Sequence, residues 1–414
     1  MTGRWPLHPL PLAGEALTSW LSRTALIYGL SIEDLIRYNL AGPGLDHADQ
    51  SVDLLDVNAP AGILSSLAEC TGVSLDRVRE MTIAGWAPWL LDTLEPDPEE
   101  GNTTAGAAFN TYVQQNSVLL RPKERRSRQV HGWRAWLPMD PKRNPMCRAC
   151  PTCVSTAPLG TVGFTLVSQL PLTLTCPHHN SRLAPAFGGA GVLAGWEGQD
   201  MHAKAARDSV NRMDSRTHEG MLNGMVSLPR RSVHVGVWFR LLRTLLDELS
   251  TPVSALGVRS SRNIQRIWQT VDHPVRAGVR GPWRAYEALP WDAQQAMLET
   301  AATALHLIEA SEITAYGTLA PLLTPEPDRI LADGTPPPAR QRDRWSEAHE
   351  AMNAVIIQAC EDAAAARALL GNLTAWTRSE ARFQRTRNDL IALGVPEHCL
   401  QQTLMEAQTC GSQR

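Results

Sequence analysis

Apolar residues recur at steps of three and four between residues 17 and 28, with polar residues between them. This periodicity predicts an amphipathic helix that ends at Gly29. Ser31 can then cap a second helix, because its hydroxyl can accept a hydrogen bond from the backbone of Asp34. The segment before the first helix, residues 4–13 (RWPLHPLPLA), contains three prolines. We expect it to lie extended over a neighbouring surface.

A second stretch repeats this pattern further along the chain. Laying residues 25–42 over residues 68–85 aligns Gly29 with Gly72 and Ser31 with Ser74. Turn glycine, capping serine and core positions coincide, so we predict two similar units that resemble a helix-turn-helix.

Helical periodicity returns in the second half of the chain. A proline-rich stretch separates the last two predicted helices from the others. The predicted helices cover residues 237–249, 256–268, 291–309, 351–370 and 376–393. We therefore predict a mainly α protein with an α-helical C-terminal half.

Two short motifs in the middle of the chain have the spacing of metal ligands. Cys150 and Cys153 lie on one CPTC turn, and Cys176 and His179 follow after an apolar stretch. Two such pairs complete the tetrahedral Cys3His set of a structural zinc site, with no open position for catalysis. Residues 161–175 alternate apolar and polar positions, which predicts a β-hairpin joining the pairs, as in a zinc ribbon.

Other ligand assignments stay open at this point. Cys147 could replace Cys150, and His178 could replace His179. Cys147, Cys150 and Cys153 also have the spacing that begins an iron–sulfur motif, but Ala157 stands where its fourth cysteine would be. We favour one structural Zn2+.

The net charge of −3 hides an uneven distribution along the chain. Residues 1–100 hold 5 basic and 15 acidic residues, whereas residues 101–150 hold 9 basic and 2 acidic ones. The acidic helices favour packing or protein docking over groove insertion, with Arg77 and Arg79 as the DNA-contacting candidates there. The basic stretch, interleaved with tryptophans, predicts a nucleic-acid-binding surface. Its candidate residues are Arg121, Lys123, Arg125, Arg126, Arg128, Arg134, Lys142 and Arg143, and the exposed helix near residue 260 adds Arg262 and Arg266.

Two motifs give the chain a resemblance to the TniQ/TnsD family of transposon target-selection proteins. One is residues 14–25 (GEALTSWLSRTA), which follow the proline-rich opening. The other combines CPTC at residues 150–153 with LTCPHHNSRL at residues 174–183. Family members often carry a further C-x-x-C after the position of Leu183, which this chain lacks, so we expect one metal ion only.

The resemblance implies a non-catalytic adaptor in DNA transposition. Such a protein recognises target DNA directly, or through a nucleic-acid-guided complex, and recruits an AAA+ ATPase regulator and a transposase. The sequence contains no phosphate-binding loop, nucleophile elbow or metalloprotease motif. The alternatives are a stand-alone zinc and helix-turn-helix transcription regulator, and a scaffold that does not bind DNA. Homodimerisation stays open.

Composition and the order of elements predict where the chain divides. No apolar run is long enough for a membrane span and no signal peptide is present, so we expect a cytoplasmic protein. We predict an acidic helical domain, a basic connector, a zinc module, a helical domain, a proline-rich linker and a helical hairpin. Their boundaries are residues 1–100, 101–146, 147–190, 191–323, 324–345 and 346–414.

Overall fold

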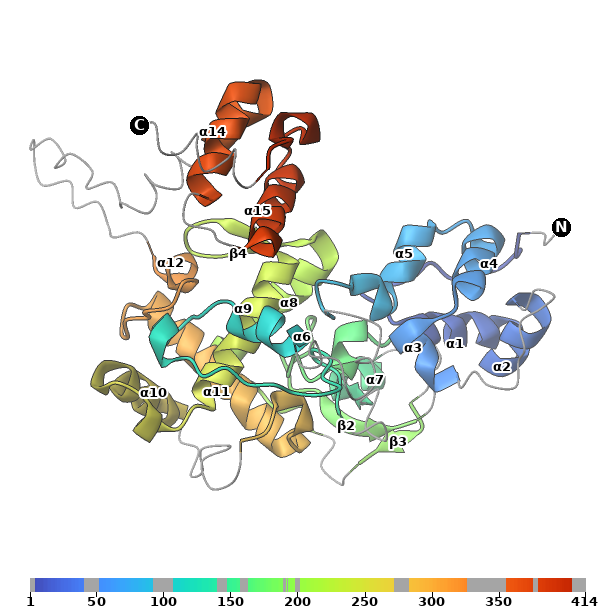
Figure 1. Ribbon diagram of the computed structural model, residues 1–414. Coiled ribbons are helices and arrows are strands. Elements are labelled where there is room, and N and C mark those ends of the chain that lie inside the picture. Colours follow the sequence, from blue (N-terminus) through green and yellow to red (C-terminus); the bar gives the residue numbers. More distant parts are fainter. Residues whose placement is uncertain are drawn as a thin grey trace, which may run out of the picture. The chain divides into compact units, whose positions relative to one another are not determined.

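The computed structural model divides the chain into two compact units, Met1–Pro327 and Asp328–Arg414 (Figure 1). The division falls inside the proline-rich stretch predicted as a linker, most of which lies outside the described residues. The six predicted domain ranges stay predictions. The structure describes residues 4–40, 52–91, 107–139, 147–156, 163–188, 191, 193–197, 202–271, 283–325, 355–374 and 379–403.

The two similar helix pairs predicted near the N-terminus are present, and both are built in the same way. In the first, α1 (Leu17–Ile27) is followed by Gly29 at φ +65° and by α2 (Ile32–Leu35), whose Asp34 amide donates to Ser31 Oγ at 3.0 Å. In the second, α4 (Ala61–Thr71) is followed by Gly72 at φ +74° and α5 (Leu75–Glu80). Ser74 caps α5 as predicted, since it accepts from the backbone of Arg77. The left-handed turns require glycine, because a Cβ is disfavoured at this φ.

The large hydrophobic core of the first unit lies among the helices of the second half of the chain. These are α8 (Asp208–Asn223), α9 (Val235–Leu249), α10 (Val258–Val271), α11 (Trp291–Glu309) and α12 (Ala320–Leu323). Thirteen of the fifteen residues of α9 are buried, so it forms the central helix. The predicted helices at 237–249, 256–268 and 291–309 are confirmed as α9, α10 and α11.

The described residues also contain short strands, short helices and turns. Strands β4 (Met225–Ser227) and β5 (Ser232–His234) form an antiparallel hairpin between α8 and α9, and a three-stranded antiparallel sheet has the order β1-β2-β3. Its strands are Arg148–Ala149, Ala184–Phe187 and Gly195–Trp196. The short helices are α3 (Leu55–Asn58), α6 (Ala107–Phe109) and α7 (Pro151–Thr156). Turns of 3-10 or π helix cover Ile36–Leu40, Val52–Leu54, Ala84–Trp86, Asn110–Gln114, Pro122–Glu124, Leu166–Gln169, Val253–Ala255, Tyr286–Ala288 and Glu397–Leu400.

The segment expected to be a β-hairpin has a different structure. Within residues 163–175 a 3-10 turn (Leu166–Gln169) and irregular backbone replace strands, apart from isolated bridges at Thr165 and Thr175. The guanidinium of Arg148, itself buried, donates to the carbonyls of Ser168, Leu170 and Thr173. These carbonyls therefore pair with a side chain, and no neighbouring strand is needed to satisfy them.

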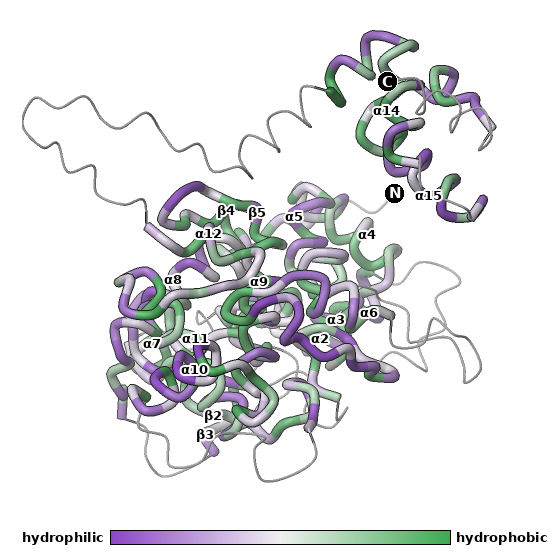
Figure 2. Tube along the Cα trace, turned by 60° about the vertical axis from the view of Figure 1, so that its left-hand side comes forward, coloured by the Kyte–Doolittle hydropathy of each residue, from purple (hydrophilic) through white to green (hydrophobic). Residues whose placement is uncertain are grey.

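The second unit is a small helical module with a core of its own. Residues 355–361, α14 (Ala363–Thr374) and α15 (Glu380–Ala392) are helical, and Phe383 and Leu370 are buried between them. Polar and apolar stretches alternate along α14 and α15 in Figure 2, which is typical of amphipathic helices. The helix predicted over residues 351–370 is interrupted at Asp362 and continues to Thr374.

No helix within the described ranges is long and apolar enough to cross a membrane.

A buried ion pair stabilises the core of the first unit. Arg243 of α9 donates from Nε and from its second terminal nitrogen to Glu287 at 2.8 and 2.9 Å. The same carboxylate accepts from the indole of Trp133 at 2.8 Å and from the backbone of Trp136. The side chains of the pair are 1% and 0% exposed, so water cannot replace a lost partner.

We predict that Arg243→Met lowers the free energy of unfolding by about 3–5 kcal/mol, because it leaves the Glu287 carboxylate buried without its counter-ion. Urea denaturation measures this change. Arg231→Met, at an exposed arginine of the β4–β5 turn, should change the free energy by less than about 0.5 kcal/mol. Equal effects of the two substitutions would contradict the importance of the buried pair.

Candidate metal centre

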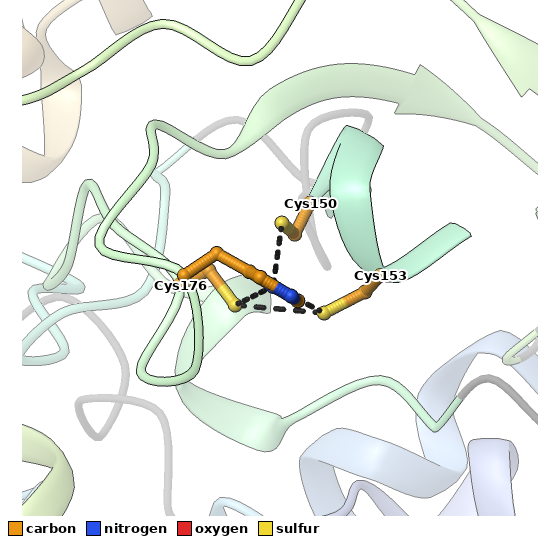
Figure 3. A group of neighbouring side chains, drawn as sticks. Cys150, Cys153 and Cys176 are labelled. Atoms are coloured by element: carbon orange, nitrogen blue, oxygen red, sulfur yellow. Dashed lines mark hydrogen bonds between the residues drawn. The ribbon is translucent and has the colours of Figure 1, made fainter. Parts of the chain in front are cut away.

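Four side chains from two distant segments converge on one point. The Sγ atoms of Cys150, Cys153 and Cys176 and a ring nitrogen of His179 all lie within 4.8 Å of one another. His179 Nδ1 is 3.6, 3.3 and 3.7 Å from the three sulfurs in that order, and the sulfurs of Cys153 and Cys176 are 3.6 Å apart. Figure 3 shows the cysteine side chains turned toward this common centre. The group could hold a metal ion.

The spacing of these atoms can be compared with a tetrahedral site. With Zn–S at about 2.3 Å and Zn–N at about 2.0–2.1 Å, ligand atoms at tetrahedral angles are about 3.8 Å (S to S) and about 3.6 Å (S to N) apart. Four of the separations, 3.3 to 3.7 Å, fall near these values, and the remaining ones lie within 4.8 Å. Three thiols and an imidazole also suit a soft or borderline divalent ion better than Mg2+ or Ca2+. The residues therefore fit such an ion in both size and chemistry.

The first ligand pair is set by the start of a helix. Cys150 directly precedes α7, and its carbonyl accepts from the amide of Val154 at 3.1 Å, so the chain turns sharply between Cys150 and Cys153. Upstream, β1 pairs with β2 in register Ala149 with Ala184. This pairing places the first pair beside the chain that leaves the second pair.

The second ligand pair lies on a tight turn. The amide of Asn180, a residue in the left-handed region at φ +51°, donates to the carbonyl of Cys176 at 3.0 Å. The amide of Cys176 donates in turn to Ser181 at 2.9 Å, and the Ser181 hydroxyl lies 3.3 Å from the sulfur of Cys150. The turn thus brings His179 back over Cys176 and connects both pairs.

Helix α8, which lies outside the metal-binding motif, fixes the backbone directly before this turn. Asp214 of α8 is completely buried, and its Oδ2 accepts from the amides of Leu174 and Thr175, both at 2.8 Å, and from the Thr175 hydroxyl at 2.7 Å. His218, one turn later, contacts the Thr175 carbonyl through Nε2 at 3.2 Å. Burial lowers the pKa of His218 to about 4, so the ring is neutral and Nε2 donates. Burial raises the pKa of Asp214 to about 6, and at pH 7.5 it therefore accepts these bonds as a carboxylate.

The electrostatics of the cluster favour a bound cation. Burial raises the pKa of the Cys153 and Cys176 thiols, and repulsion from neighbouring thiolates adds to the rise. At Cys150, burial acts in the same direction, but hydrogen bonds from Ser181 and the backbone of Cys153 outweigh it and bring the pKa to about 7. A divalent ion would stabilise all three thiolates together, and metal affinity should fall as pH decreases.

The two alternate ligands lie outside the cluster. Cys147 and His178 are not among the atoms that converge. The Cys147 carbonyl accepts from the amide of Ala186, so this residue belongs to the β1–β2 pairing, and His178 is exposed.

The N-terminal motif at residues 14–25 forms a hydrogen-bond network that docks onto the segment before the second ligand pair. Glu15 accepts from the Ser19 hydroxyl at 2.9 Å and from Arg23 at 2.6 Å, and the same hydroxyl accepts from the Phe164 amide at 2.9 Å. Two backbone bonds, from Ala16 to Phe164 and from Leu166 to Gly14, add to this contact. The residues of the motif therefore attach the N-terminal helices to the metal-binding region.

Some of the arginines predicted to contact nucleic acid have internal partners. Arg125 is bound to Glu248 at 2.8 Å and to Asp247 at 3.4 Å, and its side chain is 7% exposed. Arg128 is bound to Asp247 at 2.7 Å and stacks over Trp283. Their guanidinium groups neutralise carboxylates of α9, so they contribute little to an external positive field.

The other residues predicted to contact nucleic acid differ in how exposed their side chains are. Arg121, Lys123, Arg126, Arg262 and Arg266 are exposed, and Arg134 is half-buried. Arg266 forms an ion pair with Glu312 at 2.7 Å on the surface. Lys142 and Arg143 lie outside the described residues.

Two residues important to the site were not identified from the sequence. Arg148 lies in the basic stretch at residues 101–150, but it is an internal donor. No local pattern marks Asp214, which accepts from residues 39 and 40 positions away in the chain. The one available signal is that Asp214 lies on the apolar face of a helix, where a polar residue is expected to be buried and to need a partner.

Comparison with known proteins agrees with these motifs. The family model described as TniQ matches residues 6–183. No curated protein and no solved structure matches the chain. The matched range ends at Leu183 and includes the N-terminal helical units and all four ligand residues.

We predict that Cys150→Ser and Cys176→Ser each abolish the binding of one equivalent of metal and lower the thermal unfolding midpoint, because three ligands hold a structural ion poorly. Elemental analysis of the purified proteins and thermal denaturation measure both effects. Cys147→Ser, which changes the neighbouring cysteine outside the cluster, should retain the metal. Full metal content in both ligand variants would show that the ligand assignment is wrong.

We also predict that Asp214→Ala weakens metal binding on the order of tenfold, because the amides of Leu174 and Thr175 lose their acceptor and the second ligand pair loses its fixed position. Competition with a chromogenic chelator gives the affinity. Asp208→Ala, at an exposed position of the same helix, is the matched control. An affinity equal to that of the unmodified protein would contradict a positioning role of Asp214.

Proposed function

We propose that this protein is a target-selection adaptor of DNA transposition that does not itself catalyse strand transfer, because residues 6–183 match the model of TniQ, a transposition target-selection family. It binds target DNA, or a nucleic-acid-guided complex on that DNA, and recruits an AAA+ ATPase regulator and through it a transposase. The observation that carries the proposal is the family domain with all four potential metal ligands in place.

We propose zinc as the ion at the Cys3His cluster. Its role is structural, because four protein ligands leave no position for a substrate or a water molecule. The ion would connect the turn before α7 to the turn held by α8, and so keep the surfaces on either side in a fixed geometry.

Two surfaces of different charge support an adaptor. On the N-terminal helices Glu33 and Glu69 are exposed, while Arg77 and Arg79 each pair with a carboxylate of their own helix, at 3.2 and 3.3 Å. Arg4 and Arg37 are exposed as well, so the described part of this surface has no excess of positive charge for phosphate and suits a protein partner better. Exposed arginine and lysine residues near residues 121–126 and on α10 suit nucleic acid.

We predict that the tagged, metal-loaded protein purified from its own cells carries an ATPase and a transposase, identified by mass spectrometry. The ATPase should remain after nuclease treatment, because it is held by protein contacts. In a separate assay, retention of duplex DNA should fall steeply between about 50 and about 200 mM salt, since phosphate contacts release counterions.

Other outcomes identify the alternatives. DNA retention without any ATPase would favour a stand-alone transcription regulator and contradict the adaptor. An ATPase without salt-dependent nucleic-acid retention would favour a protein scaffold.

A further inference from the structure

Helix α10 presents a face of nucleic-acid-binding residue types to solvent. Its sequence, VRSSRNIQRIWQTV, contains three arginines, two glutamines and no acidic residue. The exposed polar residues recur at steps of three and four, as expected for one side of a helix. They are Arg259, Arg262, Gln265, Arg266 and Gln269.

The opposite side of α10 fixes it to the core. Ile264, Ile267 and Val271 are buried there, and the indole of Trp268 donates to the carbonyl of Leu249 at the end of α9. Figure 1 shows α10 at the edge of the first unit, beside α11. The exposed face is therefore held on a rigid support.

The beginning of α10 lies against the basic segment at residues 121–126. Glu124 accepts from the amide of Gly257 at 3.0 Å and from the hydroxyl of Ser260 at 2.7 Å, and it also accepts from the amide of Arg121. This single carboxylate brings the exposed Arg121, Lys123 and Arg126 next to the first turn of the helix. Two sets of residues that are more than 130 positions apart in the chain thus form one surface.

Most side chains on this face are available to a ligand. Among the residues that the structure describes, no hydrogen-bond or ion-pair partner contacts the side chains of Arg259, Arg262 and Gln265. Arg266 is paired with Glu312, but the two side chains are 52% and 45% exposed. An exposed pair of this kind is weak and can be exchanged for a phosphate.

We propose that α10 enters the major groove of duplex DNA, with the segment at residues 121–126 on the adjacent phosphate backbone. The proposal rests on the DNA-binding part of the proposed function and names the element that reads the target. A major groove admits one α-helix, and arginine and glutamine form bidentate hydrogen bonds to guanine and adenine. From residue 259 to residue 269 the helix rises about 15 Å, which spans about four base pairs.

The experiment uses the full-length metal-loaded protein and a pool of duplexes with about twenty randomised base pairs. Selection should yield a preferred sequence. Arg259→Ala/Arg262→Ala/Gln265→Ala should bind the preferred duplex at least about thirtyfold more weakly, because two or three base contacts are lost. The control Arg382→Ala/Arg385→Ala/Asn388→Ala removes two exposed arginines and one amide from α15 and should bind within about twofold of the unmodified protein.

A second variant separates base reading from charge and from folding. Arg262→Lys keeps the positive charge, so binding to unrelated duplexes should change little, whereas preference for the selected duplex should fall about tenfold. An RNA duplex of the same sequence should compete poorly, because the A-form major groove is too narrow for a helix.

Three results would overturn the proposal. The triple variant could bind the preferred duplex as tightly as the unmodified protein, the RNA duplex could compete equally, or the unmodified protein could bind no duplex at all. Each of these outcomes is independent of whether the ATPase co-purifies. Failure of the groove assignment is therefore distinguishable from failure of the adaptor function.

Discussion

The convergence of Cys150, Cys153, Cys176 and His179 is the constraint on which the rest of the structure depends. It joins a turn at the start of α7 to a turn 23 residues later, and the chain between the two contributes buried residues to the large core. In a metal-free state the three thiols resist ionising together, whereas a divalent ion would stabilise them as thiolates and add its binding free energy to folding. A loop of irregular backbone can then serve as a rigid part of the molecule.

The region matched by the family model has a core of its own only in its N-terminal helices, residues 17–81, and its metal-binding part is held by helices that follow it. Asp214 and His218 of α8 hold the second ligand turn, and Glu248 of α9 accepts from the amides of Val118 and Leu119. On the other side, the Glu15 and Ser19 network fixes the N-terminal helices to Phe164. The N-terminal helices and the helices α8 and α9 are thus connected through the same metal-binding region. For an adaptor, this arrangement would keep a protein partner and a nucleic acid in a defined relative orientation.

Local features were predictable from the sequence. The helix ends at Gly29 and Gly72, the caps at Ser31 and Ser74, and the ligand spacing within each of the CPTC and CPHH turns depend on residues a few positions apart. Features that depend on distant partners were not predictable. Arg125 and Arg128 are matched by carboxylates about 120 residues away, and the apolar alternation at residues 163–175 reflects burial around Arg148, with no sheet. A count of charges along the chain cannot separate such internal arginines from those of α10.

X-ray absorption at the zinc edge on the purified protein tests the Cys3His metal site most directly. We expect one zinc per chain with three sulfur neighbours at about 2.3 Å and one nitrogen neighbour at about 2.0–2.1 Å. A zinc ion surrounded only by oxygen and nitrogen, or a folded protein that contains no metal, would contradict it.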